Sequence, residues 1–220
     1  MDLRIPNGSV IQVVGPSGSG KTLFVCNLLQ HRIFTHDIRR IQWHMGVDEG
    51  EDGKTDTELS KLKNVSIVKG FPDGWLEEIR PHDVIVIDDL YQEANKEKDF
   101  NNLFTKIARH RNVTVIFITQ NLFHQGGSHR TRNMNVHYLV IFKNPRDQTV
   151  INYIARQAFP KNPKFLIDAF QDATFNKPHG YLFIDFSQTC PDEIRVRTDI
   201  FNKNGITVYK QSDEFQSSMQ

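Results

Sequence analysis

Residues 15–22, with the sequence Gly-Pro-Ser-Gly-Ser-Gly-Lys-Thr, constrain the fold more than any other part of the chain. They match the phosphate-loop pattern G-x-x-x-x-G-K-[ST], in which a tight turn joins a strand to a helix. A β-like apolar run, residues 9–14, leads into the turn, and a helical pattern over residues 23–29 follows it. The glycines allow consecutive backbone N–H groups to point at phosphate oxygens, and the helix adds the positive end of its dipole. The sequence therefore predicts a nucleotide-binding P-loop inside an α/β domain.

The loop as a whole is expected to hold ATP with Mg²⁺. Lys21 reaches the β- and γ-phosphates in this motif, and the Thr22 hydroxyl ligates Mg²⁺. A dinucleotide-binding fingerprint would need glycine at Leu23, and a nucleophile elbow around Ser17 would need glycine at Ser19, so both rival motifs fail. The expected nucleotide-binding residues are Gly15, Pro16, Ser17, Gly18, Ser19, Gly20, Lys21 and Thr22.

A second landmark is the run Val-Ile-Val-Ile-Asp-Asp at residues 84–89. Four successive β-favouring residues predict a central strand, and carboxylates at its carboxyl end lie where open α/β sheets bind ligands. We expect Asp88 to hold Mg²⁺, largely through water, and Asp89 to orient or deprotonate the attacking water. The wider class usually carries glutamate at the second position, so Glu93 is the alternative base.

Gln120 follows another predicted buried strand, residues 113–119. If that strand lies beside the one ending at Asp88, the Gln120 amide can hydrogen-bond both the γ-phosphate and the attacking water. The sequence therefore predicts that Gln120 senses hydrolysis.

Arg130 and Arg132 lie on a Gly- and His-rich loop. An arginine supplied across a subunit boundary can stabilise charge that develops on the γ-phosphate, and loop arginines can equally contact nucleic-acid phosphates or remain solvated. These alternatives stay open on residue chemistry alone. The scattered histidines show no metal-ligand spacing.

Composition suits a soluble globular domain that forms one folding unit. The chain has 220 residues, of which 38% are hydrophobic and 24% charged, and its net charge is +1. Any contact with nucleic acid must therefore come from a local patch. The two cysteines, Cys26 and Cys190, form no disulfide framework, which points to a reducing intracellular compartment. No apolar run approaches membrane-spanning length, and no signal peptide opens the chain.

Strands alternate with helices for most of the chain, which predicts a mostly parallel central sheet flanked by helices. One ATPase domain is expected over residues 1–204, followed by a polar tail, residues 205–220, that frays. One or two helical turns are expected over residues 75–79. The expected helices are 20–32, 95–110, 144–158 and 164–170, and the expected strands are 9–14, 40–44, 65–68, 84–89, 113–119, 138–142, 181–186 and 193–200.

Taken in order, these landmarks resemble a known family. The segments that carry the likeness include residues 15–22, 84–93, 113–123 and 130–147, and it extends over about residues 8–201. The chain resembles the genome-packaging ATPases of Maverick/Polinton elements and related large DNA viruses. These ATPases form the poxvirus-type branch of the FtsK–HerA superfamily, whose fold is a RecA/FtsK-like P-loop NTPase.

The resemblance implies a motor that hydrolyses ATP to translocate double-stranded DNA into a preformed viral capsid, with DNA stimulating the ATPase. It implies a homo-oligomeric ring, commonly a hexamer, working in the host nucleus or cytoplasm where virions assemble, or carried in the virion. Arg130 falls on the arginine before the family's N-x-x-Y segment and is the expected trans-acting finger. Where relatives show Ser-His-His, this chain reads Ala-Arg-His at residues 108–110, so Arg109 is a second candidate.

Two other functions remain open from the sequence. A P-loop nucleotide kinase shares the phosphate loop, but it would need an acceptor-binding lid, and residues 124–135 give no convincing one. A nucleotide- or DNA-binding subunit that has lost hydrolysis is the non-enzyme alternative, since Asp89 is shorter than the usual glutamate.

Overall fold

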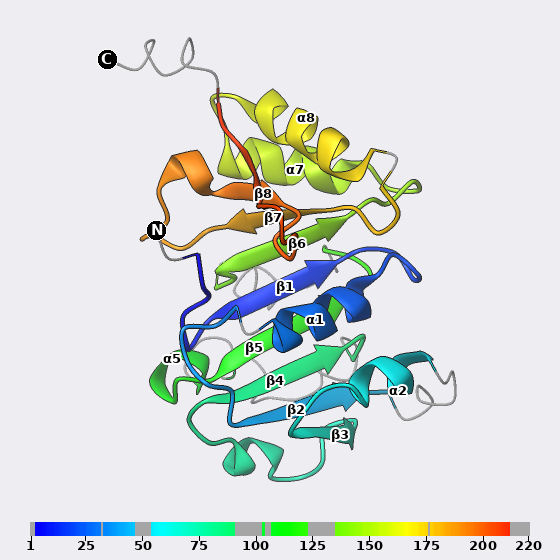
Figure 1. Ribbon diagram of the computed structural model, residues 1–220, viewed down its shortest axis with the longest axis vertical. Helices are drawn as coiled ribbons and strands as arrows, with labels where there is room; N and C mark the ends of the chain where they lie inside the picture. Colours follow the sequence, from blue (N-terminus) through cyan, green and yellow to red (C-terminus); the bar gives the residue numbers. More distant parts are fainter. Residues whose placement is uncertain are drawn as a thin grey trace.

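A single mixed sheet runs through the part of the chain that the structure describes (Figure 1). The computed structural model describes residues 3–31, 33–46, 54–90, 103, 107–122, 135–175 and 177–211, with backbone alone at 54–56. Within them, nine strands form the sheet in the order β3-β2-β4-β5-β1-β6-β7-β8-β9. The strands are β1 (Val10–Val14), β2 (Arg40–Met45), β3 (Val65–Lys69), β4 (Asp83–Asp88), β5 (Thr114–Thr119), β6 (Tyr138–Phe142), β7 (Tyr181–Asp185), β8 (Val196–Thr198) and β9 (Thr207–Tyr209). The predicted α/β class with a mostly parallel sheet is confirmed.

Helices cover both faces of this sheet. The described helices are α1 (Lys21–Gln30), α2 (Lys54–Leu59), η1 (Trp75–Glu78), α5 (Ala108–His110), α7 (Thr149–Ala158), α8 (Pro163–Thr174) and η3 (Asp192–Ile194). Of the predicted 95–110 helix, only its end is described, and α5 stops at His110 as expected. The 3-10 helix η1 supplies the short helical segment predicted at residues 75–79.

The order of the strands decides which residues meet at the end of the sheet that carries the P-loop. β5 lies between β1 and β4 and is parallel to both, with Val14 level with Thr119 and Asp88 level with Ile118. The ends of β4, β5 and β1 therefore share one edge, here called the carboxyl edge. The opposite edge, where β1 and β6 begin and antiparallel β7 ends, is called the amino edge.

Alternation along the strands separates the apolar core into layers. Residues on one side of the sheet, such as Val13 and Val86, pack with Phe24 and Leu28 of α1. The other side is covered by α7 and α8 beside β1, β6 and β7, and by Trp75, Ile79 and Leu103 beside β4 and β5. Because alternate residues share a face, Asp88 continues the row of Val84 and Val86 on the α1 side.

Both long carboxyl-terminal helices have local start signals. Asn162 caps α8 by accepting a hydrogen bond from the Phe165 N–H at 3.3 Å, and Pro163 takes the first helical position. The helix predicted from residue 144 begins only at Thr149, because Asp147 Oδ1 accepts from the Thr149 N–H at 2.9 Å. Asp147 therefore ends a turn before α7, and this prediction was wrong by about one helical turn.

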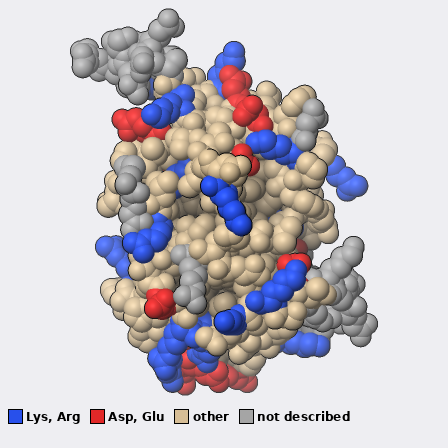
Figure 2. Space-filling view, in the orientation of Figure 1, with Lys and Arg blue, Asp and Glu red and all other residues tan. Residues whose placement is uncertain are grey.

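Charged side chains are dispersed over the face that carries α1. Figure 2 shows Lys and Arg spread across this face, with Asp and Glu gathered mainly toward its two ends. No continuous basic stripe is visible on the described part of this face. That distribution agrees with the near-zero net charge of +1.

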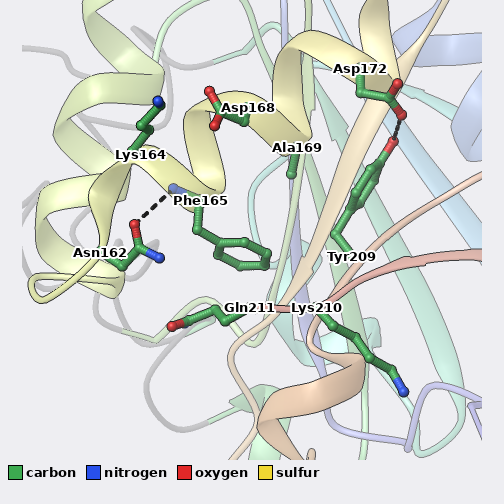
Figure 3. Close-up of a pocket in the computed structure, with 9 residues that line it drawn as sticks. All are labelled: Asn162, Lys164, Phe165, Asp168, Ala169, Asp172, Tyr209, Lys210 and Gln211. Carbon is green, nitrogen blue, oxygen red and sulfur yellow. Dashed lines mark hydrogen bonds between the residues drawn. The ribbon is translucent and has the colours of Figure 1, made fainter. Parts of the chain in front are cut away.

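The sheet extends further toward the carboxyl terminus than the sequence predicts. Residues 207–209 do not fray; they form β9, which pairs antiparallel with β8. The Tyr209 hydroxyl of β9 donates to Asp172 of α8 at 2.6 Å. Beside this bond, residues of α8 and β9 line a hollow of about 410 Å³ (Figure 3). The rest of the expected tail, residues 212–220, lies outside the described residues.

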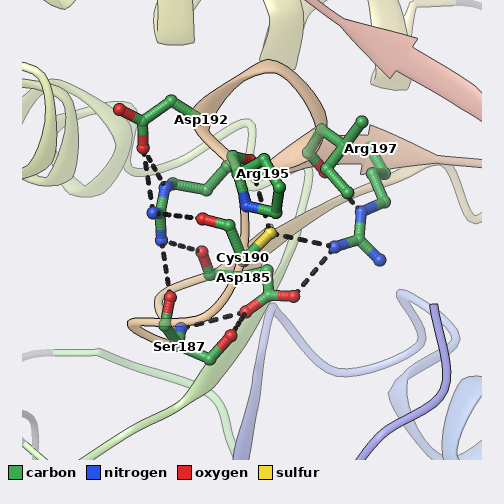
Figure 4. Close-up of polar contacts among 8 residues, drawn as sticks. Asp185, Ser187, Cys190, Asp192, Arg195 and Arg197 are labelled. Atoms are coloured by element: carbon green, nitrogen blue, oxygen red, sulfur yellow. Dashed lines mark hydrogen bonds and ion pairs between the residues drawn. The ribbon is translucent and has the colours of Figure 1, made fainter. Parts of the chain in front are cut away.

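A polar cluster at the amino edge explains why the strand predicted over residues 193–200 is shortened to β8 (Figure 4). The Arg195 guanidinium donates to the backbone carbonyls of Asp185 and Cys190 and binds the Asp192 carboxylate at 2.9 Å. These bonds hold residues 192–194 in the 3-10 turn η3. Arg197 then forms a buried ion pair with Asp185 at 2.8 Å.

Among the described residues, no helix combines the length and apolar character needed to cross a lipid bilayer.

Candidate nucleotide-binding site

The P-loop closes tightly between β1 and α1. Gly18 has φ 74° and Gly20 has φ 102°, and both lie in the left-handed region that favours glycine. Gly15 is needed for space, because a Cβ there would lie 2.6 Å from the Phe142 Cβ. The Ser19 N–H donates to the Pro16 carbonyl at 3.2 Å, so the loop folds back on itself. Glycine is therefore required at these positions of the predicted phosphate-binding loop, either by backbone conformation or by lack of space.

Lys21 and Thr22 open α1 directly after the loop. Lys21 is buried, at 7% exposure, and its Nζ donates to the Pro16 carbonyl at 3.1 Å. The ammonium group therefore lies across the loop rather than in solvent. The Ser19 hydroxyl oxygen is buried inside the loop with no hydrogen-bond partner among the described residues. A buried hydroxyl without a partner, in a glycine-rich loop that also carries a lysine ammonium, suits an anionic ligand.

The predicted acidic pair stands at the end of β4. Asp88 is buried, at 8% exposure, and accepts a hydrogen bond from the Trp43 indole N–H at 3.3 Å. Asp89 adopts φ 49°, and its N–H donates to the Ile118 carbonyl of β5 at 3.2 Å. The chain therefore turns sharply between the two acids, and their carboxylates bind different side chains.

Gln120 joins the pair from the neighbouring strand. It follows β5, and its Nε2 donates to Asp89 Oδ2 at 3.1 Å. The Gly15 N–H donates to the Thr119 carbonyl at 3.2 Å, so the P-loop is tied to the strand that carries Gln120. Sequence reasoning placed the strand before Gln120 beside the strand ending at Asp88, as observed, but did not predict the bond from Gln120 to Asp89.

The remaining predicted residues are separated from this group. Arg109 lies on α5, ahead of the first residue of β5, and thus at the amino edge of the sheet. Arg130, Arg132 and Glu93 lie outside the described residues. The described part of the chain therefore brings together the P-loop, the acidic pair and Gln120, and leaves Arg109 at the opposite edge of the sheet.

Two contacts were missed from the sequence. Trp43 binds Asp88 because β2 is aligned with β4, with Trp43 level with Val86, so its side chain falls on the α1 face. This pairing could have been found by asking which strand flanks β4. His179 precedes β7, and its ring Nδ1 donates to the Ser19 carbonyl at 2.9 Å. No local pattern signals that contact, since the two residues are 160 positions apart.

Cys26 lies on α1 near the acidic pair but has no nucleophilic character. Burial is the main cause that raises the pKa of its thiol to about 12, and the negative charges of Glu58 and Asp88 add to the effect. The thiol therefore stays protonated at neutral pH. Cys26 and Cys190 are both buried and free.

Comparison with known proteins identifies the fold. No protein-family model and no curated protein sequence matches the chain. Among solved structures, the chain is similar to the DNA-packaging ATPase B204 of Sulfolobus Turreted Icosahedral Virus, with TM-score 0.56 and 13% identity over 94% of this chain and 100% of that one. It is also similar to the genome packaging NTPase B204 of Sulfolobus turreted icosahedral virus 2 in complex with ATP-gammaS, with TM-score 0.55 and 15% identity over 93% and 98%. The AMP complex of that NTPase gives TM-score 0.54 and 14% identity over 94% and 99%. The fold is that of P-loop packaging ATPases.

Proposed function

We propose that this chain is the ATP-hydrolysing subunit of a motor that packages viral or transposon DNA into a capsid. The observation that carries the proposal is the shared carboxyl edge, where the P-loop, the acidic pair and Gln120 meet on adjacent strands. Support also comes from the fold, which matches viral packaging ATPases along their full length. The sequence motifs add the narrower assignment to the poxvirus-type, FtsK–HerA branch.

In this proposal the P-loop binds the phosphates of ATP. The backbone N–H groups of Gly18, Gly20 and Thr22 and the buried Lys21 ammonium would neutralise the β- and γ-phosphates. The orphaned Ser19 hydroxyl and the glycine cradle fit such a polyanion. Thr22 and Asp88 would hold Mg²⁺, which commonly binds one or two protein ligands together with phosphate oxygens. When bound, Mg²⁺ neutralises charge on the β- and γ-phosphates.

Asp89 is the residue we assign to the attacking water. Its carboxylate lies next to the Gln120 amide, so that amide can fix its orientation. An in-line displacement needs positioning more than covalent help, and a short acid held by a neighbouring strand supplies positioning. When the Gln120 amide hydrogen-bonds the γ-phosphate, it would no longer bond Asp89. The presence or loss of the γ-phosphate would therefore change the hydrogen bonds at the end of β5.

The partners follow from the motor hypothesis. A homo-oligomeric ring, of which a hexamer is the expected form, would place Arg130 of one subunit at the γ-phosphate of the next. Double-stranded DNA would pass through the ring into the capsid, gripped by its phosphates. Because the net charge is only +1, the grip would come from a local patch of Lys and Arg side chains.

The test measures phosphate release by the intact chain with and without duplex DNA over a salt series. We expect DNA to stimulate hydrolysis and the stimulation to weaken steeply with salt, because DNA binding releases counterions. A rate unaffected by duplex DNA contradicts the motor. Transfer of phosphate to an acceptor would indicate a nucleotide kinase, and absence of turnover a binding subunit.

A further inference from the structure

A nucleotide bound as proposed above must leave the P-loop in a definite direction. Its γ-phosphate end faces Asp88, Asp89 and Gln120, which belong to the ends of β4 and β5. Both strands lie on one side of β1 in the sheet, and β6 and β7 lie on the other. The α-phosphate and the nucleoside therefore extend toward β6 and β7.

Of the hollows described on that side, one adjoins the P-loop and is large enough for a nucleoside, whereas another, of about 330 Å³, lies at the His31 end of α1, away from the loop. A small cavity lined by Gly15, Phe142 and Asp147 has a volume of about 20 Å³, which holds no more than about one water. A second hollow has a volume of about 480 Å³, within the usual range of ligand pockets. The hollow between α8 and β9 is separated from β1 by three strands and is too remote (Figure 3). The residues of the 480 Å³ hollow, here called the flank hollow, are Lys177, Pro178, His179, Gly180, Tyr181, Asp199, Phe201 and Asn202.

The flank hollow directly adjoins the P-loop through His179. The His179 ring donates to the Ser19 carbonyl at 2.9 Å. It also packs on Gly20 so closely that a Cβ at Gly20 would lie 2.8 Å from the ring Nδ1. The exposed His179 side chain is therefore shared by the P-loop and the flank hollow.

The inner wall of the hollow is aromatic. Tyr181 and Phe201 pack against Phe24 of α1, with ring centroids 4.8 Å and 5.1 Å from it. At the rim, Lys177 and Asp199 form a partly exposed ion pair at 3.1 Å. Flat apolar walls with a few polar groups are what a nucleobase and its ribose need.

We propose that the flank hollow binds the ribose and base of the nucleotide, with His179 as the residue that contacts both the P-loop and the nucleoside. This inference rests on the proposed function, because it takes the direction of the nucleotide from the acidic pair.

The experiment separates the nucleoside from the phosphates by using two probes on the full chain. Affinities for ATP and for inorganic tripolyphosphate, each with Mg²⁺, are measured by titration calorimetry. The variants are His179→Ala, which removes the shared contact, and Asn202→Trp, which fills the hollow. His110→Ala replaces an exposed histidine on α5 and serves as the matched control.

Both variants should lower ATP affinity about tenfold and change tripolyphosphate affinity by less than about twofold. His110→Ala should change neither. Unchanged ATP affinity in both variants overturns the inference, and so does an equal loss of both probes, which would mean that His179 acts on the loop alone. If the unmodified chain binds neither probe, the proposed function fails first, and the two failures are thereby distinguished.

Discussion

Buried aspartates stand at both edges of the sheet, and their surroundings differ in kind. At the amino edge, Asp185 is neutralised by the Arg197 guanidinium at 2.8 Å and accepts two further bonds from Ser187. At the carboxyl edge, Asp88 accepts from the Trp43 indole and Asp89 from the Gln120 amide. Both of these donors are uncharged. The first arrangement fixes β7 to β8 with a permanent cation (Figure 4), whereas the second orients the carboxylates with an indole N–H and an amide N–H.

This contrast teaches that burial of an acid alone does not identify a functional site. A permanent counter-charge suits a structural clamp, since a buried charge needs a partner. Neutral donors suit an acid whose charge is to be met by a metal or a proton in the reaction cycle. The predictions below set the two edges against each other.

The largest effect is expected for Lys21→Ala at the carboxyl edge. Loss of the ammonium should reduce phosphate release by roughly a thousandfold, because it removes charge stabilisation that is concentrated in the transition state. Far-UV circular dichroism should be unchanged, since the core rows of β1 and α1 remain. Substantial turnover by this variant would mean that the P-loop is not the hydrolytic site.

Arg197→Met at the amino edge should act on stability instead. It leaves the Asp185 carboxylate buried without its guanidinium, and such a loss costs about 3–5 kcal/mol of unfolding free energy. Denaturant titration measures the change. At temperatures where the variant is folded, ATP turnover should match that of the unmodified chain.

Asp88→Asn provides the matched comparison at the other edge. We expect a near-complete loss of turnover with a change in unfolding free energy below about 1 kcal/mol, since asparagine can still accept from the Trp43 indole. If this variant were as unstable as Arg197→Met, the distinction between the two edges would be wrong.

Gln120→Ala should give a smaller kinetic effect of about 10- to 100-fold in kcat, with little change in KM. The amide orients Asp89 and does not contribute uniform binding of ATP. Gln120→Glu is the sharper variant, because a second carboxylate beside Asp89 should lower the rate further. Equal rates for the unmodified chain and both variants would remove Gln120 from the reaction.

The smallest effect is a pH dependence that both edges share. Burial lowers the pKa of His44, near the end of β2, below its ordinary 6.5, and burial together with Arg109 lowers that of His137 at the amino edge. Below pH 6.5 the unfolded chain binds more protons, so the stability present above 6.5 is lost as pH falls toward the lowered values.

Each of these histidines can contribute no more than about 1.4 kcal/mol per pH unit. His44→Asn and His137→Asn should each flatten the fall in thermal midpoint between neutral and mildly acidic pH. His110→Asn, at an exposed position, should leave the slope unchanged. A slope unaffected by either buried variant would assign the acid sensitivity to other groups.

Local sequence patterns predicted where the P-loop and the acidic pair lie in the fold, because each of them belongs to one short segment of the chain. The P-loop needs only its own glycines, and Asp88 follows from an apolar strand and its alternation. The bond from Gln120 to Asp89 needs the order of three strands, which the sequence only suggested. Trp43 and His179 could not be assigned, since their contacts depend on register and on a turn far along the chain.

Errors in the fold have the same origin. The sequence of residues 193–200 is typical of one strand. In the structure, the Arg195 guanidinium donates to three backbone carbonyls, and these bonds favour the 3-10 turn η3 at the start of the segment. Residues 207–209 read as tail because three residues are too few for a pattern, and only pairing with β8 makes them a strand. Hydrogen bonds to neighbouring segments of the chain decided both cases.

The position of β9 has a practical consequence for anyone who shortens this protein. Cutting the chain after residue 204 would remove the outermost strand and leave β8 with unpaired backbone N–H and C=O groups along one side. An uncovered border of that kind recruits strands from other molecules and promotes aggregation. If such a truncated protein were insoluble, the loss of β9 would explain it. Shortened versions should therefore keep the chain up to Gln211.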